Sequence, residues 1–208
     1  MANATATCTI SAYPTGTNNT QRRQQHYGTV GITASTAQYV QGGVRINFAS
    51  LEPIKSNSML PLLFRAESTS GSGYQYRFNP NGPTITNLAL TSNVVTITAK
   101  NNLAAGDIVV LTGLTTTAAL NGTVLTVLAG SLTATAFTAN LTHGNIVSGA
   151  ETGFCNIQSY ASGLPFQGNL QIFTGAAAQS ALAELSTGNT PAAVSGDQIV
   201  FESHFLHA

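Results

Sequence analysis

The middle of the chain, residues 83–153, consists of short apolar runs separated by turn residues. In the segment Val94–Thr98, apolar side chains alternate with threonine, which is the period of two that puts alternate residues on one face of a strand. Asn121-Gly122 is one of several turn signals between the runs. Short strands about 10 residues apart are typical of a small β-sandwich or barrel. The strands we expect are Thr84–Leu90, Val94–Ala99, Ile108–Leu111, Thr123–Leu128 and Thr135–Leu141.

The segments on either side of this stretch have strand patterns that would pair with each other. Tyr74, Tyr76 and Phe78 share one face of the first segment, and Leu170 and Ile172 share one face of the second. An insertion at a hairpin tip is well tolerated, because the backbone there is exposed. We therefore expect an Ig-like module inserted over residues 83–153, within a discontinuous β domain that comprises residues 31–82 and 154–208.

The flanking domain should contain further strands and one helix. Its candidate strands are Val44–Phe48, Leu60–Phe64 and Gln198–Phe205. A short helix is expected near Ala176–Leu185, because this segment is rich in alanine, the strongest helix former, and Gly188 can end it. The predicted fold class is mostly β: a small β domain, sheet or barrel, with one short helix, carrying an inserted Ig-like β-sandwich.

The amino-acid composition limits the classes of partner that we expect for this protein. Charged residues make up only 7% of the chain, against about 25% in ordinary soluble proteins. The surface must therefore be covered by threonine, serine, asparagine, glutamine, glycine and alanine, which suits a protein packed against other proteins. The formal net charge of zero provides no broad field to attract nucleic acid or an anionic membrane. We expect neither as a partner.

The N-terminal residues have neither the basic nor the apolar region of a secretory signal. No stretch of the sequence approaches the ~18 apolar residues of a membrane span. We expect the chain to be made in the cytoplasm, and its two cysteines, Cys8 and Cys155, to be small buried or half-buried residues rather than a disulfide.

Sequence motifs give no support to an enzyme. The chain contains no nucleophile elbow, zinc-protease helix motif or phosphate-binding loop motif, and none of its four histidines lies within a motif. Asp107 and Asp197 each follow a glycine just before an apolar strand, which is typical of a turn. Glu202, His204 and His207 could collect a metal, but three candidate ligands at a chain end favour a structural role. We predict no catalytic, cofactor-binding or metal-binding residues.

The first thirty residues are polar and rich in turn residues. We expect an extended N-terminal arm over residues 1–30 that orders on a partner, with a plain disordered terminus as the equal alternative. Two adjacent arginines neutralise too few phosphates for strong nucleic-acid binding. We therefore interpret Arg22, Arg23 and Tyr27 as the residues of this arm that contact a neighbouring protein.

The insert resembles the Ig-like modules of many tailed-phage surface proteins. The likeness covers about a third of the chain and is carried by Thr84–Thr98, Ala105–Val109, Leu114-Thr115 and Leu120–Gly122. The flanks are similar to small phage proteins that coat the major capsid lattice, through Tyr74–Phe78 and Gly196–Glu202.

This resemblance to capsid decoration (cement) proteins implies a location on the outer capsid surface of the virion. The protein would add to a preformed shell, bridge major capsid subunits, and direct its Ig-like module outward for weak contact with host surfaces. It also implies a homo-oligomer, with a trimer favoured and a dimer as the alternative. A neutral, polar surface is compatible with binding in many copies, because multivalency amplifies modest single contacts.

Two other functions compete with decoration. A tail or fibre component would use the Ig-like module to bind a host receptor and would be present in few copies per particle. A polysaccharide depolymerase would require two carboxylates about 5–10 Å apart in a groove. The seven acidic residues include no pair close in sequence, so we expect no enzymatic activity.

Overall fold

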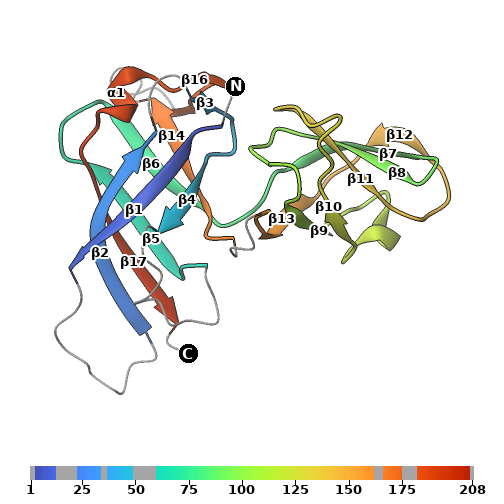
Figure 1. Ribbon diagram of the computed structural model, residues 1–208, viewed down its shortest axis with the longest axis horizontal. Coiled ribbons are helices and arrows are strands. Elements are labelled where there is room, and N and C mark those ends of the chain that lie inside the picture. The colour runs from blue at the N-terminus through green and yellow to red at the C-terminus, as the bar shows by residue number, and fades with distance from the viewer. Residues whose placement is uncertain are drawn as a thin grey trace. The chain divides into compact units, whose positions relative to one another are not determined.

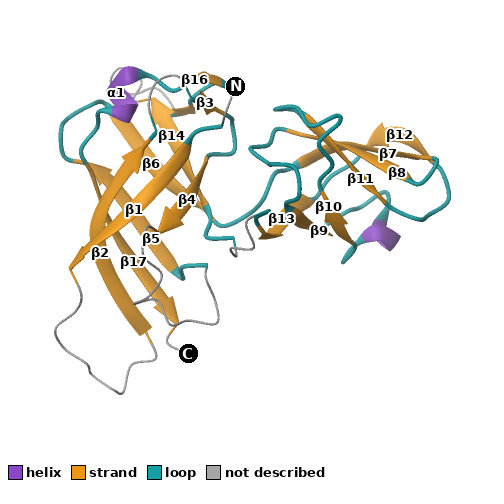
Figure 2. Cartoon of the chain, viewed as in Figure 1, coloured by secondary structure: helices purple, strands orange, loops and turns teal. Residues whose placement is uncertain are grey.

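The computed structural model of the chain describes residues 3–12, 23–33, 37–48, 60–161, 166–174 and 182–206. Over these residues the protein is mostly β, as the sequence predicts (Figures 1 and 2). The chain forms two compact units: a first unit of residues 1–80 and 167–208, and a second unit of residues 81–166. Within the described residues, no helix is long and apolar enough to cross a membrane.

The first unit is built around one sheet of eight strands. The strands follow the order β15-β14-β4-β1-β2-β17-β5, and β6 pairs with the other edge of β14, so the sheet curls into a nearly closed barrel. The pairs are antiparallel except for β1 with β4. Their bounds are β1 Thr5–Ala12, β2 Arg23–Ile32, β4 Val44–Phe48, β5 Leu63–Ser68, β6 Tyr74–Asn79, β14 Asn169–Thr174, β15 Ala183–Glu184 and β17 Ile199–Leu206. A two-stranded pair, β3 Gln38–Tyr39 with β16 Gly188–Asn189, and the short helix α1 Ala192–Ser195 complete the unit.

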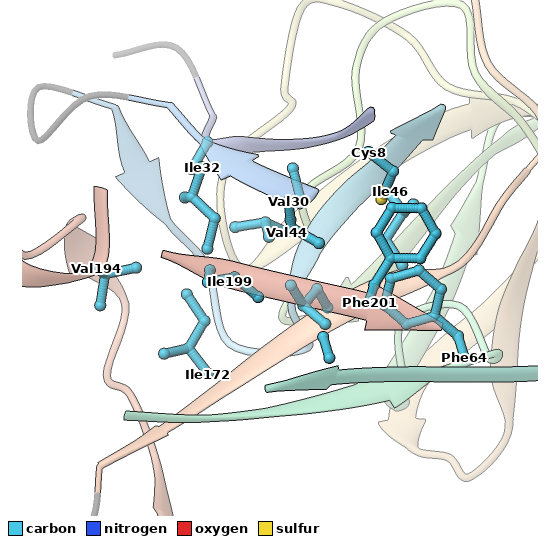
Figure 3. Packing of buried hydrophobic residues seen from close by; sticks show 14 of the residues in the cluster. Cys8, Val30, Ile32, Val44, Ile46, Phe64, Ile172, Val194, Ile199 and Phe201 are labelled. Carbon is cyan, nitrogen blue, oxygen red and sulfur yellow. The ribbon is translucent and has the colours of Figure 1, made fainter. Parts of the chain in front are cut away.

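The barrel interior is filled by alternate residues of these strands (Figure 3). An aromatic cluster forms part of this core: the ring of Phe48 lies 5.8 Å from that of Phe201 and 5.3 Å from that of Phe205, and Phe64 stacks on Phe201 at 5.3 Å. Val194 on α1 is also part of the core cluster. Each large buried side chain contributes roughly 1.5–3 kcal/mol by leaving water.

The expected N-terminal arm is wrong, because residues 5–12 and 23–32 are strands of the barrel. β2 lies between β1 and β17 and pairs with both. The inward positions of β2 include His26 and Gly28. Because neither is a large apolar residue, the sequence of this strand does not show apolar residues at every second position. Gly28 is required there, because a Cβ atom would lie 2.0 Å from the carbonyl oxygen of Thr9. The sequence therefore looks polar and irregular although the strand is central.

The second unit contains two antiparallel sheets, ordered β11-β8-β7-β12 and β10-β9-β13. Their bounds are β7 Ile85–Thr91, β8 Val94–Ala99, β9 Ile108–Thr112, β10 Val124–Thr126, β11 Ala136–Asn140, β12 Ile146–Ala150 and β13 Phe154–Ser159. A 3-10 turn, η1, spans Ala118–Leu120. Ser92 and Asn93 both have positive φ, which is the turn geometry of a tight hairpin between β7 and β8. Alternate residues such as Val95 and Ile97 are fully buried, as predicted.

The unit boundaries differ from the expected insert of residues 83–153. β13 pairs with β9 through Cys155 and Leu111, so residues 154–159 belong to the second unit. The apolar alternation of β13 cannot reveal this pairing, since any strand could accept it. Cys155 and Cys8 are buried free thiols in different units.

The helix expected near residues 176–185 lies largely outside the described residues. At its C-terminal end, Ala183 and Glu184 form the strand β15, which pairs with Thr174 and Phe173. The Glu184 carboxylate also accepts hydrogen bonds from the Tyr39 hydroxyl at 2.7 Å and the Gly42 amide at 2.6 Å. These tertiary contacts outweigh helix propensity, which is only a weak preference.

Candidate functional site

Three adjacent strands, β2, β17 and β5, present a mixed polar and apolar face to the outside of the barrel. Register places Glu202 opposite Tyr27 on one side and Arg65 on the other. Because side chains alternate along a strand, the neighbours of these residues turn into the core. We call this surface the β17 face and define it by Gln25, Tyr27, Leu63, Arg65, Glu67, Val200, Glu202 and His204.

A hydrogen-bonded network occupies the centre of the β17 face. The Glu202 Oε1 atom lies 2.8 Å from His204 Nε2 and accepts a hydrogen bond from Gln25 Nε2 at 2.6 Å. Gln25 also donates to the Tyr27 hydroxyl. The hydrogen bond with His204, then that from Gln25 and the charge of Arg65, lower the pKa of Glu202 below its usual range. The network therefore keeps a negative charge fixed beside an exposed aromatic ring.

Exposed apolar side chains surround this network. Tyr27 is 42% exposed, Val200 43%, Leu63 39% and the adjoining Leu62 53%. A cluster of exposed apolar side chains next to hydrogen-bonded polar groups is the composition of a protein–protein interface.

The three residues predicted to contact a partner differ in where they lie in the structure. Tyr27 lies on the β17 face, although on a barrel strand rather than on an arm. Arg23 is the first residue of β2 and its backbone is opposite Leu206; its side chain is outside the described part of the chain. Arg22 lies outside the described residues altogether.

The three histidines within the described residues lie in different environments. His26 is buried in the barrel with its ring edge on Phe205, at 5.8 Å, and desolvation lowers its pKa. His143 is exposed in a loop of the second unit, whereas His204 lies on the β17 face. His207 is outside the described residues. Among the residues that are described, no group of three or more histidine, cysteine, aspartate or glutamate side chains could hold a metal.

A groove of about 990 Å³ runs along one edge of the β17 face, between β5 and β6. Its lining includes the buried or half-buried rings of Phe64, Tyr76 and Phe78 and the exposed side chains of Arg65 and Arg77. We call this groove the seam.

Asp197 organises the hairpin at one end of the seam, a role that the sequence did not reveal. Its carboxylate accepts hydrogen bonds from Ser68 Oγ at 2.7 Å, Ser72 Oγ at 2.6 Å and the Tyr76 hydroxyl at 2.5 Å, and also from Ser70 Oγ. Burial alone would raise the pKa of Asp197, but the four hydroxyl donors outweigh it and lower the pKa to about 2. In the sequence, only the close spacing of the serines in this loop could have indicated that role.

Glu151 has the corresponding role in the second unit and was also missed. Its buried carboxylate accepts backbone hydrogen bonds from Thr115, Thr116, Thr117 and Thr152 at 2.7–3.0 Å, and the Thr117 hydroxyl donates at 2.8 Å. Burial raises its pKa, but these donors together bring it well below its usual range.

Asp107 accepts backbone hydrogen bonds from Ala104 at 2.8 Å and Ala161 at 2.9 Å, in keeping with the turn role expected for it. The hydrogen bonds described above for Asp107, Glu151, Asp197 and Glu202 all join a carboxylate to a group other than a carboxylate. These acidic groups thus bind hydroxyl, amide, imidazole and backbone donors, as structural carboxylates do.

No protein-family model, curated protein or solved structure matches this chain.

Proposed function

We propose that the protein is a structural component of a tailed-phage particle that decorates the outer surface of the capsid and stabilises it by bridging major capsid subunits. The observation that supports this most is the β17 face, where Tyr27, Leu63 and Val200 are exposed around the Glu202 network. Such a face buries apolar area against a partner while its polar groups keep their hydrogen bonds.

The low charge of the chain supports the same proposal. With 7% charged residues and no net charge, two copies or a copy and a shell subunit can meet without electrostatic repulsion. We propose that the protein acts as a homo-oligomer, with a trimer favoured over a dimer, and that the second unit makes weak outward contacts with the host surface. No catalytic step and no cofactor form part of this function.

Copy number in purified particles tests the proposal. Quantitative mass spectrometry against the major capsid protein should give a fixed ratio set by the capsid lattice. A handful of copies per particle would instead assign the protein to the tail or a fibre, where the second unit would bind a receptor.

A further inference from the structure

Asparagine is followed by glycine at two places in the chain, Asn81-Gly82 and Asn121-Gly122. Such a pair is chemically reactive, because the backbone nitrogen of the glycine can attack the side-chain amide carbon, Cγ, of the asparagine. Glycine has no Cβ atom to obstruct this approach, and its backbone reaches conformations that are closed to other residues. Both asparagines are exposed to water. The two pairs differ, however, in how the structure holds the reacting groups.

At Asn121-Gly122, hydrogen bonds hold both the side chain and the attacking nitrogen. Asn121 Oδ1 accepts a hydrogen bond from the Leu114 amide at 2.8 Å, and Asn121 Nδ2 donates to the Leu114 carbonyl at 3.0 Å. The Gly122 amide donates to the Leu111 carbonyl at 2.8 Å, and the Leu111 amide donates to Thr123 at 3.0 Å. The reaction must break these bonds first, so it requires a local opening of the structure.

The attacking nitrogen of the other pair is held more weakly. Gly82 N lies 3.4 Å from Asn156 Oδ1, which is longer than an ordinary hydrogen bond between nitrogen and oxygen. Asn81 lies in a bend, two residues after the end of β6 at Asn79. The reaction of Gly82 N therefore breaks one long hydrogen bond to a side chain, whereas the reaction of Gly122 N breaks a short bond between backbone groups.

The fold also requires glycine after Asn81. A Cβ atom on residue 82 would lie 1.8 Å from the carbonyl oxygen of Cys155, and the obstructing atom belongs to the backbone of β13. No residue with a side chain fits there without moving that strand. The packing of the second unit thus fixes the one neighbour that makes Asn81 most reactive.

We propose that Asn81 is a site of spontaneous deamidation and that Asn121 is protected from it. Gly82 N forms a bond to Asn81 Cγ and loses its proton, the bond from Cγ to Nδ2 breaks, and ammonia leaves a cyclic imide behind. Water then opens the imide at either carbonyl group, which gives aspartate or isoaspartate. Both products add a negative charge to a chain whose formal net charge is zero. Isoaspartate also adds a methylene group to the backbone between β6 and β7. This inference does not depend on the proposed function.

The test follows both pairs in the full chain by quantitative peptide mass spectrometry. One sample is kept folded in mildly alkaline buffer, and an equal sample is kept unfolded in concentrated urea. In urea the two asparagines should convert at similar rates, because the contacts that distinguish them are absent. In the folded chain Asn81 should convert at least about tenfold faster than Asn121, which must first give up several hydrogen bonds.

The variant Asn81→Gln identifies the modified residue. Glutamine would have to form a six-membered ring, which closes much more slowly, so the mass change in this peptide should disappear. Amide exchange in β7 and β8 should remain as in the wild type, because residue 81 is exposed.

Three results would overturn the inference. The first is equal conversion of the two asparagines in the folded chain, or faster conversion of Asn121. The second is no conversion of Asn81 in the folded chain over a period in which the urea sample converts. The third is persistence of the mass change in the Asn81→Gln variant, which would place the modification at another residue.

Discussion

Each unit of the chain contains a carboxylate that accepts hydrogen bonds from a hydroxyl-rich loop. The kind of donor differs between the two units. In the first unit, Asp197 is bound by side-chain hydroxyls from the β5–β6 hairpin. In the second unit, Glu151 is bound mainly by consecutive backbone amides of residues 115–117. Backbone amides cannot rotate away as serine hydroxyls can. The Asp197 site therefore depends on the side-chain rotamers of the serines, whereas the Glu151 site depends on the backbone conformation of residues 115–117.

The cores differ as well. The first unit depends on an aromatic cluster around Phe48, whereas the buried positions of the second unit are mostly aliphatic. Phe48→Ala should lower the free energy of unfolding of the first unit by about 3–5 kcal/mol, because it leaves a cavity among Phe64, Phe201 and Phe205. Native-state hydrogen exchange can measure the two units separately, and exchange in β7 and β8 should be unchanged. An equal loss in both units would show that they unfold together.

Glu151→Gln should produce the next largest loss, about 2–4 kcal/mol, in the second unit. The amide side chain cannot offer charge-assisted acceptors to several donors, and hydrogen bonds to charged groups contribute about 1.5–3 kcal/mol each. Denaturant unfolding followed by the β7 and β8 amides measures this loss. Glu67→Gln, at an exposed carboxylate, is the matched control and should stay within about 0.5 kcal/mol of the wild type.

Asp197→Asn should cost less, about 1–2 kcal/mol, since asparagine retains one acceptor oxygen and the site is only partly buried. The pKa of Asp197 is lowered to about 2 from 3.8, so its stabilisation is complete above about pH 4 and is lost as the pH falls toward 2. The variant should remove this part of the acid transition of the first unit. An unchanged acid transition would contradict the role of the serine donors.

We expect the buried His26 side chain to cause a smaller difference in stability between the two units, at mildly acidic pH. Burial lowers its pKa below the usual 6.5, so the unfolded chain binds the proton first and the first unit should lose stability as the pH falls below about 6.5. The second unit does not contain His26 and serves as the comparison. Unfolding midpoints of both units between pH 7.5 and about 5 test this, and a parallel decline in both would exclude His26 as the cause.

Tyr27→Ala should have the smallest effect on folding, within about 0.5 kcal/mol, because the side chain is exposed. It should nevertheless weaken rebinding to particles stripped of the protein, measured by sedimentation. Val147→Ala, at a residue 90% exposed in the second unit, is the control and should rebind normally. If both variants rebind like the wild type, Tyr27 is not part of the contact.

Sequence alone predicted β7 to β11 of the second unit because these strands alternate apolar and hydroxyl residues, as in Val94–Ala99, and tight turns carry turn residues such as Ser92-Asn93. It predicted neither β12 nor β13 as a strand, and it assigned the residues of β13 to the other domain. It failed for β1 and β2, because inward positions of β2 are occupied by Gly28 and His26, and those of β1 include the small residues Ala6 and Cys8, rather than large apolar side chains. Local pattern cannot show that a glycine fills a core position when the reason is a neighbouring strand.

The candidate site was predictable only in part for the same reason. Tyr27 stands out in its segment, but Arg65 and Glu202 become its neighbours only through strand register. The seam exists because, over the part of the chain that the structure describes, no ladder joins β5 to β6. The serine donors of Asp197 are far from it in sequence. Tertiary pairing, which no local pattern contains, determines all three features.

A cryo-electron microscopy reconstruction of the purified particle is the most direct test of the central claim. We predict the first unit on the outer capsid surface at regular lattice positions, with the β17 face covered by capsid protein. Density for the protein at the tail, or on the capsid with the β17 face turned to solvent, would contradict the account.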